Sequence, residues 1–201
     1  MDSIGLALRS RKKQTVLYEQ GFLVMQGEDA QIVRFEQVEA VYIKKLDVSY
    51  EGTSALTMLG GTLLGGVVGG ALSSLASGRI LLRYKINMRD GRVISSDFPE
   101  VGGRALEELT LREMPVLKDS YREGKDLQFG ALLISKKGLE SKKGILPWSE
   151  LEAPTVDEQF RLVIKRQRSW LAWLQLLIEK IPNFPICFDL LTELQKTQGN
   201  L

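Results

Sequence analysis

Residues 79–96, RILLRYKINMRDGRVISS, predict a β-hairpin, and the residues after them predict a helix. Apolar and polar side chains alternate in the second half of 79–88, the pattern of a strand with one buried face. The Asp90-Gly91 pair is a strong two-residue turn signal, and 93–96 supply the returning strand. From residue 100 onward the apolar side chains take helical spacing. A hairpin that leads into a helix indicates an α+β fold.

The predicted helix spans residues 100–122. Its apolar face consists of Leu106, Leu109, Met114, Leu117 and Tyr121. Pro115 interrupts the helical pattern, because proline removes a backbone N–H donor and its ring clashes with the preceding turn. We therefore expect either a kink at this position or two abutting helices.

Upstream of the hairpin, four short runs have the composition of strands. Turn-forming residues separate the first three runs from one another, and β-branched residues are frequent in the fourth. The four predicted strands cover residues 15–18, 22–25, 31–35 and 38–43. Strands followed by a helix therefore form one complete unit in the first half of the chain.

The second half of the chain repeats this order. Short strands are expected at 127–130, 131–135, 138–140 and 145–148, followed by a hairpin of 150–156 and 159–165 and by a final helix over 185–196. Residues 170–181 could form an amphipathic helix or a strand, because periodicity does not separate the two in a short apolar run. Their position after a hairpin favours a closing strand.

Several short motifs resemble an uncharacterised bacterial family of tandem pleckstrin-homology-like domain proteins. The residues that carry the resemblance in the second half are Gly124, Phe129-Gly130, Leu139 after Gly138, Leu146-Pro147-Trp148 and Ile181-Pro182-Asn183. The first half matches more loosely, through Tyr18, Gly21, Tyr84 and Asp90-Gly91. The resemblance implies domains that bind lipid headgroups or peptides, and it supplies no catalytic residue.

The predicted organisation is a basic N-terminal tail over 1–13, a first pleckstrin-homology-like unit over 14–123 and a second over 124–197. Within the first unit, residues 52–78 form an apolar, glycine-rich insert that contains no charged residue. The fold class is thus α+β, with a helical-hairpin-like insert between two strands of the first unit.

The composition argues against an enzyme. The chain of 201 residues contains no histidine, which removes the commonest metal ligand and the commonest acid–base group near neutral pH. The net charge of +2 provides no global field for nucleic acid. We therefore expect no catalytic residue, no metal, no cofactor and no nucleic-acid partner.

Two local features fit that expectation. The basic run 165–168 lies beside Trp170 and Trp173, a combination that can hold single-stranded nucleic acid, but a hairpin end beside core tryptophans is the favoured interpretation. The single cysteine, Cys187, lies in an apolar run and is expected to be a buried, unreactive thiol. The N-terminus lacks the charge order of a secretory signal, which favours a cytoplasmic protein.

The insert at 52–78 is the most distinctive feature of the sequence. Gly61, Gly65 and Gly69 are four residues apart, which on a helix makes a flat face against which another backbone can pack. Each glycine costs about 1 kcal/mol relative to alanine in a helix, so a covering surface is needed to offset that cost. The expected contact residues are Leu59, Gly61, Leu63, Leu64, Gly65, Val67, Val68, Gly69, Leu72 and Leu75.

The strands on either side limit how the insert can meet a membrane. If 38–43 and 80–88 share one sheet, a single crossing would separate them, so the segment must leave and return. Two helices of about twelve residues would each reach about 18 Å, less than a bilayer core. A re-entrant wedge or a glycine-lined helical hairpin fits better. The flanking basic residues Lys44, Lys45, Arg79 and Arg83 are the expected lipid-headgroup contacts.

Three interpretations of the insert remain open at this stage. It could contact an anionic membrane, pack against a protein partner or a second copy of the chain, or be a passive loop. The leading prediction is a non-enzymatic membrane-associated binding or scaffold protein in the cytoplasm, attached peripherally to the inner face of a membrane. The alternative is a soluble interaction module that self-associates or docks a partner through the insert.

Overall fold

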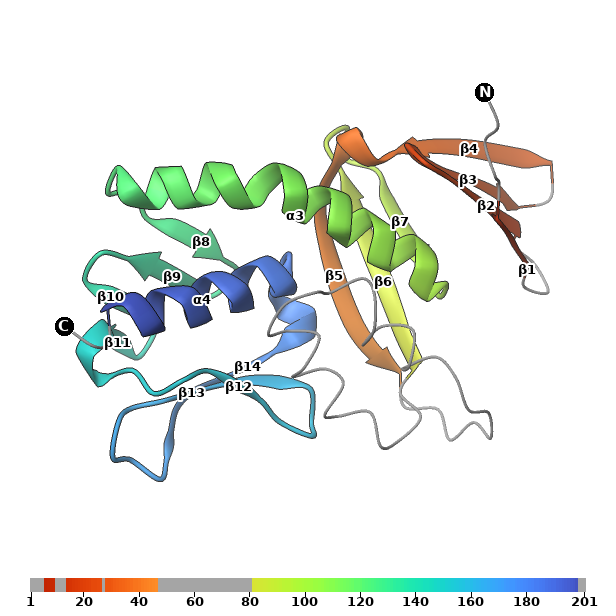
Figure 1. The fold of residues 1–201 in the computed structure, drawn as a ribbon. Helices are drawn as coiled ribbons and strands as arrows, with labels where there is room; N and C mark the ends of the chain where they lie inside the picture. The colour runs from red at the N-terminus through yellow and green to blue at the C-terminus, as the bar shows by residue number, and fades with distance from the viewer. Residues whose placement is uncertain (1–5, 10–13, 27, 47–80, 199–201) are drawn as a thin grey trace.

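The computed structural model describes residues 6–9, 14–26, 28–46 and 81–198, and these form an α+β protein (Figure 1). Within the described residues, four small antiparallel sheets combine with the α-helices α3 and α4. The predicted α+β class is therefore confirmed. The predicted contact residues of the insert lie outside the described residues.

The first half of the chain contains two of the sheets. The four-stranded sheet consists of β1 (Leu6–Arg9), β2 (Gln14–Tyr18), β3 (Gly21–Gln26) and β4 (Asp29–Arg34). A 3-10 turn, η1 (Phe35–Gln37), leads into the three-stranded sheet of β5 (Val38–Leu46), β6 (Leu81–Met88) and β7 (Val93–Ser96). Helix α3 (Pro99–Arg122) follows.

The second half repeats the same succession. Its four-stranded sheet consists of β8 (Leu127–Phe129), β9 (Leu132–Ser135), β10 (Gly138–Ser141) and β11 (Gly144–Pro147). The 3-10 turn η3 (Trp148–Glu150) precedes β12 (Thr155–Val156), β13 (Arg161–Lys165) and β14 (Ala172–Leu177). After η4 (Ile178–Lys180), helix α4 (Phe184–Gln198) ends the repeat. Each half is thus a four-stranded sheet, a 3-10 turn, a three-stranded sheet and a helix.

The hairpin predicted from residues 79–96 is confirmed as β6 and β7. Gly91 has a φ of 84°, a conformation that glycine adopts without strain, and it donates its N–H to the Met88 carbonyl. Along β6, Leu82, Tyr84, Ile86 and Met88 are buried while Arg83 and Lys85 are exposed, which is the predicted alternation.

Helix α3 runs through Pro115 without dividing, so the expected alternative of two abutting helices is wrong. Proline leaves the carbonyl of the residue four positions earlier without its helical donor. That residue is Leu111, which is 69% exposed, so water can reach this turn. At 24 residues, α3 is about 36 Å long and extends from the first half of the protein to the second.

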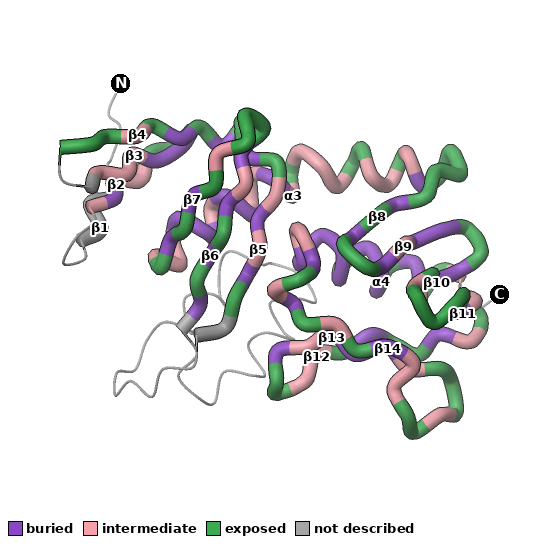
Figure 2. Tube along the Cα trace, turned by 180° about the vertical axis from the view of Figure 1, so that it is seen from behind, coloured by how far each residue is buried: buried purple, intermediate pink, exposed green. Residues whose placement is uncertain are grey.

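One cluster of buried residues includes side chains from both halves. Figure 2 marks buried residues along the chain in each half. In the first half, α3 packs closely on β6: a Cβ at Gly102 would lie 2.0 Å from the Tyr84 ring, so only glycine fits there. In the second half, Trp148 is buried and donates its indole N–H to the Ser135 carbonyl at 2.9 Å. The division into units at residues 123 and 124 remains a prediction.

Several local expectations differ from the structure. Residues 6–9, expected in a basic tail, form β1 and pair with β2. The strand expected over 150–156 is reduced to β12, because η3 turns the chain after Pro147 and Leu151 makes only an isolated bridge to Arg166. Residues 170–181 contain β14, which confirms the closing strand.

No helix within the described ranges is long and apolar enough to cross a membrane.

Candidate functional site

The ends of β5 and β6 lie side by side where the chain leaves for residue 47 and returns from residue 80. Leu46 pairs directly with Leu81 in the antiparallel register, so both ends of the intervening segment start from one end of the sheet. In Figure 1 this end lies at the lower side of the molecule, away from helix α3.

Two of the predicted headgroup residues are brought together at this end. Lys44 and Arg83 are direct cross-strand partners, so their side chains lie on the same face of the sheet. Both are exposed. Lys85, two positions along β6, lies on the same face, with its ammonium 5.4 Å from the centre of the Tyr42 ring. Lys45's side chain and Arg79 lie outside the described residues.

Lys44 and Arg83 each have a carboxylate nearby. The Nζ atom of Lys44 is 3.8 Å from Glu179. Arg83 makes a two-pronged contact with Asp97, with Nε–Oδ1 at 2.5 Å and Nη2–Oδ2 at 3.1 Å. The hydrogen bond to Asp97 raises the pKa of Arg83, and the negative charge of Asp97 adds to this effect. Asp97 therefore competes with any anionic ligand for Arg83.

A second candidate region is the junction between the two halves. Asn183, in the loop before α4, accepts a hydrogen bond from the Val41 N–H at 2.8 Å and donates its own N–H to the Val41 carbonyl at 2.9 Å. Val41 belongs to β5, an edge strand of its sheet, so Asn183 satisfies both polar groups of one residue on a free edge. This contact holds the second half of the protein against the first.

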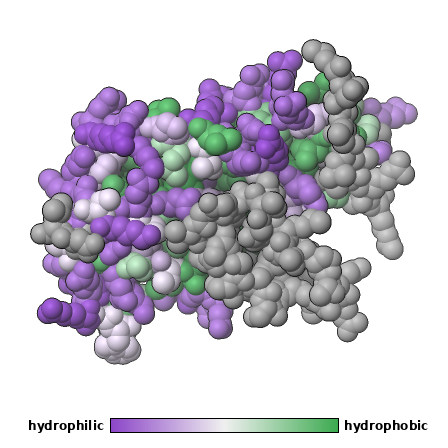
Figure 3. Space-filling model, viewed as in Figure 1, coloured by the Kyte–Doolittle hydropathy of each residue, from purple (hydrophilic) through white to green (hydrophobic). Residues whose placement is uncertain are grey.

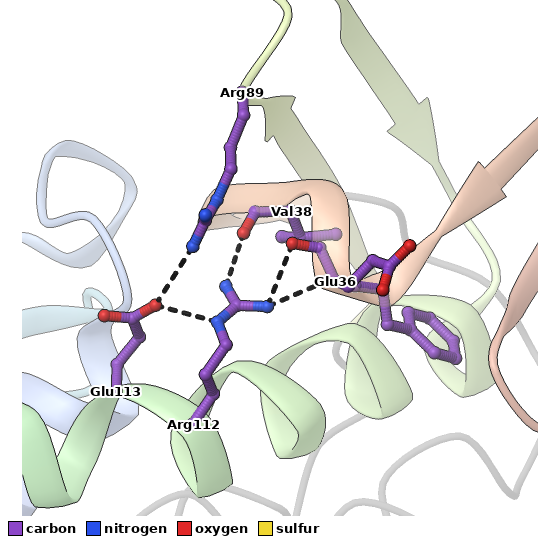
Figure 4. Close-up of polar contacts among 6 residues, drawn as sticks. Glu36, Val38, Arg89, Arg112 and Glu113 are labelled. Atoms are coloured by element: carbon purple, nitrogen blue, oxygen red, sulfur yellow. Dashed lines mark hydrogen bonds and ion pairs between the residues drawn. The ribbon is translucent and has the colours of Figure 1, made fainter.

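Next to this contact lies a cleft of about 460 Å³. Its walls come from both halves and from α3: Glu39, Arg89, Glu113, Leu117, Gln128, Phe129, Pro182 and Asn183. Figure 4 shows that Glu113 lies between two arginines, with Arg112 Nε at 2.8 Å and Arg89 Nη2 at 3.7 Å from its Oε1 atom. Within the cleft, two arginines therefore balance the charge of Glu113.

Arg112 acts as a structural clamp in this network. Its guanidinium reaches from α3 to the turn η1 and donates hydrogen bonds to the carbonyls of Phe35, Glu36 and Val38 (Figure 4). The Phe35 carbonyl also accepts the Val38 N–H that closes the turn, and the planar guanidinium supplies several donors at once. Arg112 therefore positions α3 rather than offering a free charge.

Two further acidic residues of α3 form ion pairs within that helix. Arg104 pairs with both Glu107 and Glu108. Across the residues described here, no group of three His, Cys, Asp or Glu side chains could hold a metal ion. Cys187 is fully buried, and burial raises the pKa of its thiol, so the thiolate needed for nucleophilic chemistry is disfavoured.

The turn between β13 and β14 carries the most exposed large apolar side chain among the described residues. Trp170 is 85% exposed, so the expectation that it belongs to the core is wrong. Leu171 beside it is 57% exposed, and Trp173 is half-buried. Figure 3 shows that the described surface of this face is otherwise mainly hydrophilic, with small, separate hydrophobic areas. Sequence reasoning missed this feature because it treated all the tryptophans as core residues.

Comparison with known proteins places the chain only by family. A family model described as "Family of unknown function (DUF6585)" matches residues 78–200, from just before β6 to beyond α4. No curated protein and no solved structure matches the chain.

Proposed function

The chain belongs to DUF6585, a family of unknown function, and on the geometry above we propose that it is a non-enzymatic scaffold of two tandem pleckstrin-homology-like units that attaches reversibly to an anionic membrane. The repeated succession of two small sheets and a helix supports the tandem arrangement. The absence of histidine from the sequence and the pairing of Glu113 with two arginines in the cleft support a binding role.

The pairing of Leu46 with Leu81 is the observation that carries the proposal. Because of this pairing, the charge-free stretch 52–78 is connected at both ends to neighbouring strands. A segment that enters a bilayer from there has to return to the side from which it entered. A stretch of this length without charge has a large cost in water unless another surface covers it. The acyl-chain region of a membrane offers such a surface.

The exposed cations beside this point support an anionic membrane in particular. Lys44 and Arg83 face the same side of the sheet, and their present ion pairs are solvent-exposed. Exposed ion pairs are worth about 0–1 kcal/mol, so lipid phosphates can replace the carboxylates at small cost. Each basic group near an anionic membrane contributes about 1 kcal/mol to attachment. Attachment at the inner face of a membrane from the cytoplasm is the corresponding location.

The experiment replaces residues 53–78 with a short Gly-Ser linker and measures co-sedimentation with phosphatidylcholine vesicles, with and without phosphatidylserine. Because the ends of β5 and β6 are already paired, a short connection closes the hairpin without a change of register. The expected result is binding by the full chain to the anionic vesicles and loss of that binding in the variant. Unchanged sedimentation would contradict the proposal. A fall in oligomeric mass in the variant without any lipid dependence would favour self-association instead.

A matched pair of substitutions tests the basic face. Asp97→Asn releases Arg83 at the open end of the hairpin, whereas Asp90→Asn makes the same charge change at the β6–β7 turn, the other end of β6. Vesicle affinity is expected to rise by about fivefold with Asp97→Asn, the equivalent of one additional cation at the surface. An equal rise with Asp90→Asn would mean that only net charge matters.

A further inference from the structure

The turn that joins β13 to β14 presents two apolar side chains on a well-ordered backbone. Ser169 donates its N–H to the Arg166 carbonyl at 3.0 Å, and its hydroxyl bonds to both the N–H and the carbonyl of Leu171. Gln167 donates its N–H to the Glu150 carbonyl at 2.7 Å, which ties the turn to η3. Because its backbone is held in this way, the turn keeps Trp170 and Leu171 in solvent.

The surroundings of these two side chains are basic. Residues 159–178, which include the whole β13–β14 hairpin, contain Arg161, Lys165, Arg166 and Arg168 and no acidic residue. Arg166 pairs with Glu150 at 2.8 Å, and Arg161 pairs with Asp157. Within the described part of the chain, Arg168 makes no ion pair. Arg168 is exposed and stands two residues from Trp170.

The turn lies on the side of the molecule toward which β5 and β6 open. In Figure 1 both the β13–β14 turn and the end of the β5–β6 pair point downward, and α3 lies above both of them. The reversed view in Figure 2 has the same arrangement. Both features therefore face the same side of the molecule.

From these observations we infer that the β13–β14 turn is a second membrane contact, in which Trp170 and Leu171 enter the interface of an anionic bilayer while Arg166 and Arg168 meet lipid phosphates. This inference rests on the proposed membrane attachment. Tryptophan favours the bilayer interface because its ring is apolar and its indole N–H is polar. Arginine beside it supplies the positive charge that attracts anionic lipid headgroups.

A nucleic-acid ligand fits the turn less well. Single-strand binding uses several aromatic rings on which successive bases stack. Here the neighbour of Trp170 is the aliphatic Leu171, and Trp173 is half-buried. An aliphatic side chain next to a tryptophan suits acyl chains rather than bases.

The test compares full-length variants on phosphatidylcholine vesicles with and without phosphatidylserine. Trp170→Ala is expected to weaken binding to the anionic vesicles by about tenfold or more, because a tryptophan side chain buries a large apolar area. Leu171→Ser is expected to weaken it as well. Leu111→Ser is the matched control, since Leu111 is 69% exposed but lies on α3, and it is expected to have no effect. Arg168→Gln is expected to cost about fivefold, and Arg122→Gln on α3 nothing.

A second readout locates the ring directly. Vesicles with brominated acyl chains should quench the fluorescence of the native protein more than that of Trp170→Phe, because the two remaining tryptophans are less accessible: Trp148 is buried in the core and Trp173 is half-buried. Equal quenching of the two proteins, together with unchanged binding of Trp170→Ala, would overturn the inference and leave the proposed function intact. Loss of binding with Trp170→Ala but not with the 53–78 replacement would support the turn as a membrane contact and overturn attachment through the insert. Quenching by a single-stranded oligonucleotide and not by vesicles would overturn the inference in favour of nucleic acid.

Discussion

Asn183 and Val41 exchange two hydrogen bonds although 142 positions separate them in the chain. The side-chain oxygen of Asn183 accepts the Val41 N–H in the place of a backbone carbonyl. The backbone N–H of Asn183 donates to the Val41 carbonyl. Asn183 has a φ of 52°, in the left-handed region, which asparagine tolerates better than most residues. Its carbonyl then accepts the N–H of Cys187 in the first turn of α4. One residue therefore connects the edge of β5 to the start of the last helix.

Asn183→Ala should destabilise the protein by about 2–5 kcal/mol. It leaves the Val41 N–H without its partner, at about 1–3 kcal/mol, and places alanine in a left-handed conformation, at about 1–2 kcal/mol. Asn183→Gly removes the same hydrogen bond without the conformational strain, so it should cost less. The measurement is urea unfolding followed by tryptophan fluorescence. Equal losses for the two variants would show that the backbone conformation contributes nothing.

Arg112→Met should destabilise the protein by about 1–3 kcal/mol, because it removes the donor to three carbonyls of η1 and β5 while it keeps the aliphatic stem. Arg122→Met is the control on the same helix. Arg122 is exposed, and its ion-pair partner among the described residues is Asp119, so its loss should change stability by less than about 0.5 kcal/mol. Thermal unfolding by circular dichroism measures both. If the two variants melt together, Arg112 is not a clamp.

Stability should fall at alkaline pH because buried acids, Cys187 and Tyr84 among them, titrate later in the folded protein than in the unfolded chain. Burial raises the pKa of the Cys187 thiol above its ordinary value of 9.0 and the pKa of the Tyr84 phenol above 10.0. The unfolded chain thus loses these protons first, so stability is full below about pH 9 and declines as the pH rises further. Each group contributes a slope of up to about 1.4 kcal/mol per pH unit.

Urea midpoints measured from about pH 8 to about pH 11 test this expectation. The variant Cys187→Ala removes the thiol and should therefore lose the part of the decline that begins near pH 9, while the part that begins near pH 10 persists. A decline of the same shape in the variant would rule out Cys187 as one of the responsible groups.

Local signals in the sequence predicted much of the fold. The alternation along β6, the Asp90-Gly91 turn and the spacing of Leu106 and Leu109 depend on neighbours within a few residues, so they could be read directly. The prediction at Pro115 went further than the local rule allows. Two separate helices would follow only if the turn at Leu111 were sealed from water, and its exposure depends on what packs there.

The candidate sites were less accessible to sequence reasoning. Lys44 and Arg83 could be chosen for their position beside the insert, but the carboxylates of Glu179 and Asp97 that pair with them became visible only in three dimensions. Trp170 was assigned to the core because tryptophan is usually buried there. Its exposure follows from the turn at Ser169, whose hydrogen bonds direct the neighbouring side chains outward.

The sequence by itself determined the α+β class, the repeated succession of strands and helix, and the place of the charge-free stretch between two strands. These features follow from periodicity and from residue conformations, which act over short distances along the chain. The tertiary structure alone decided that Leu46 meets Leu81, that Asn183 joins the two halves, and that the β13–β14 turn opens to the same side as β5 and β6. Such relationships depend on which distant surfaces bury each other, and the pattern of one segment contains no information about its partner.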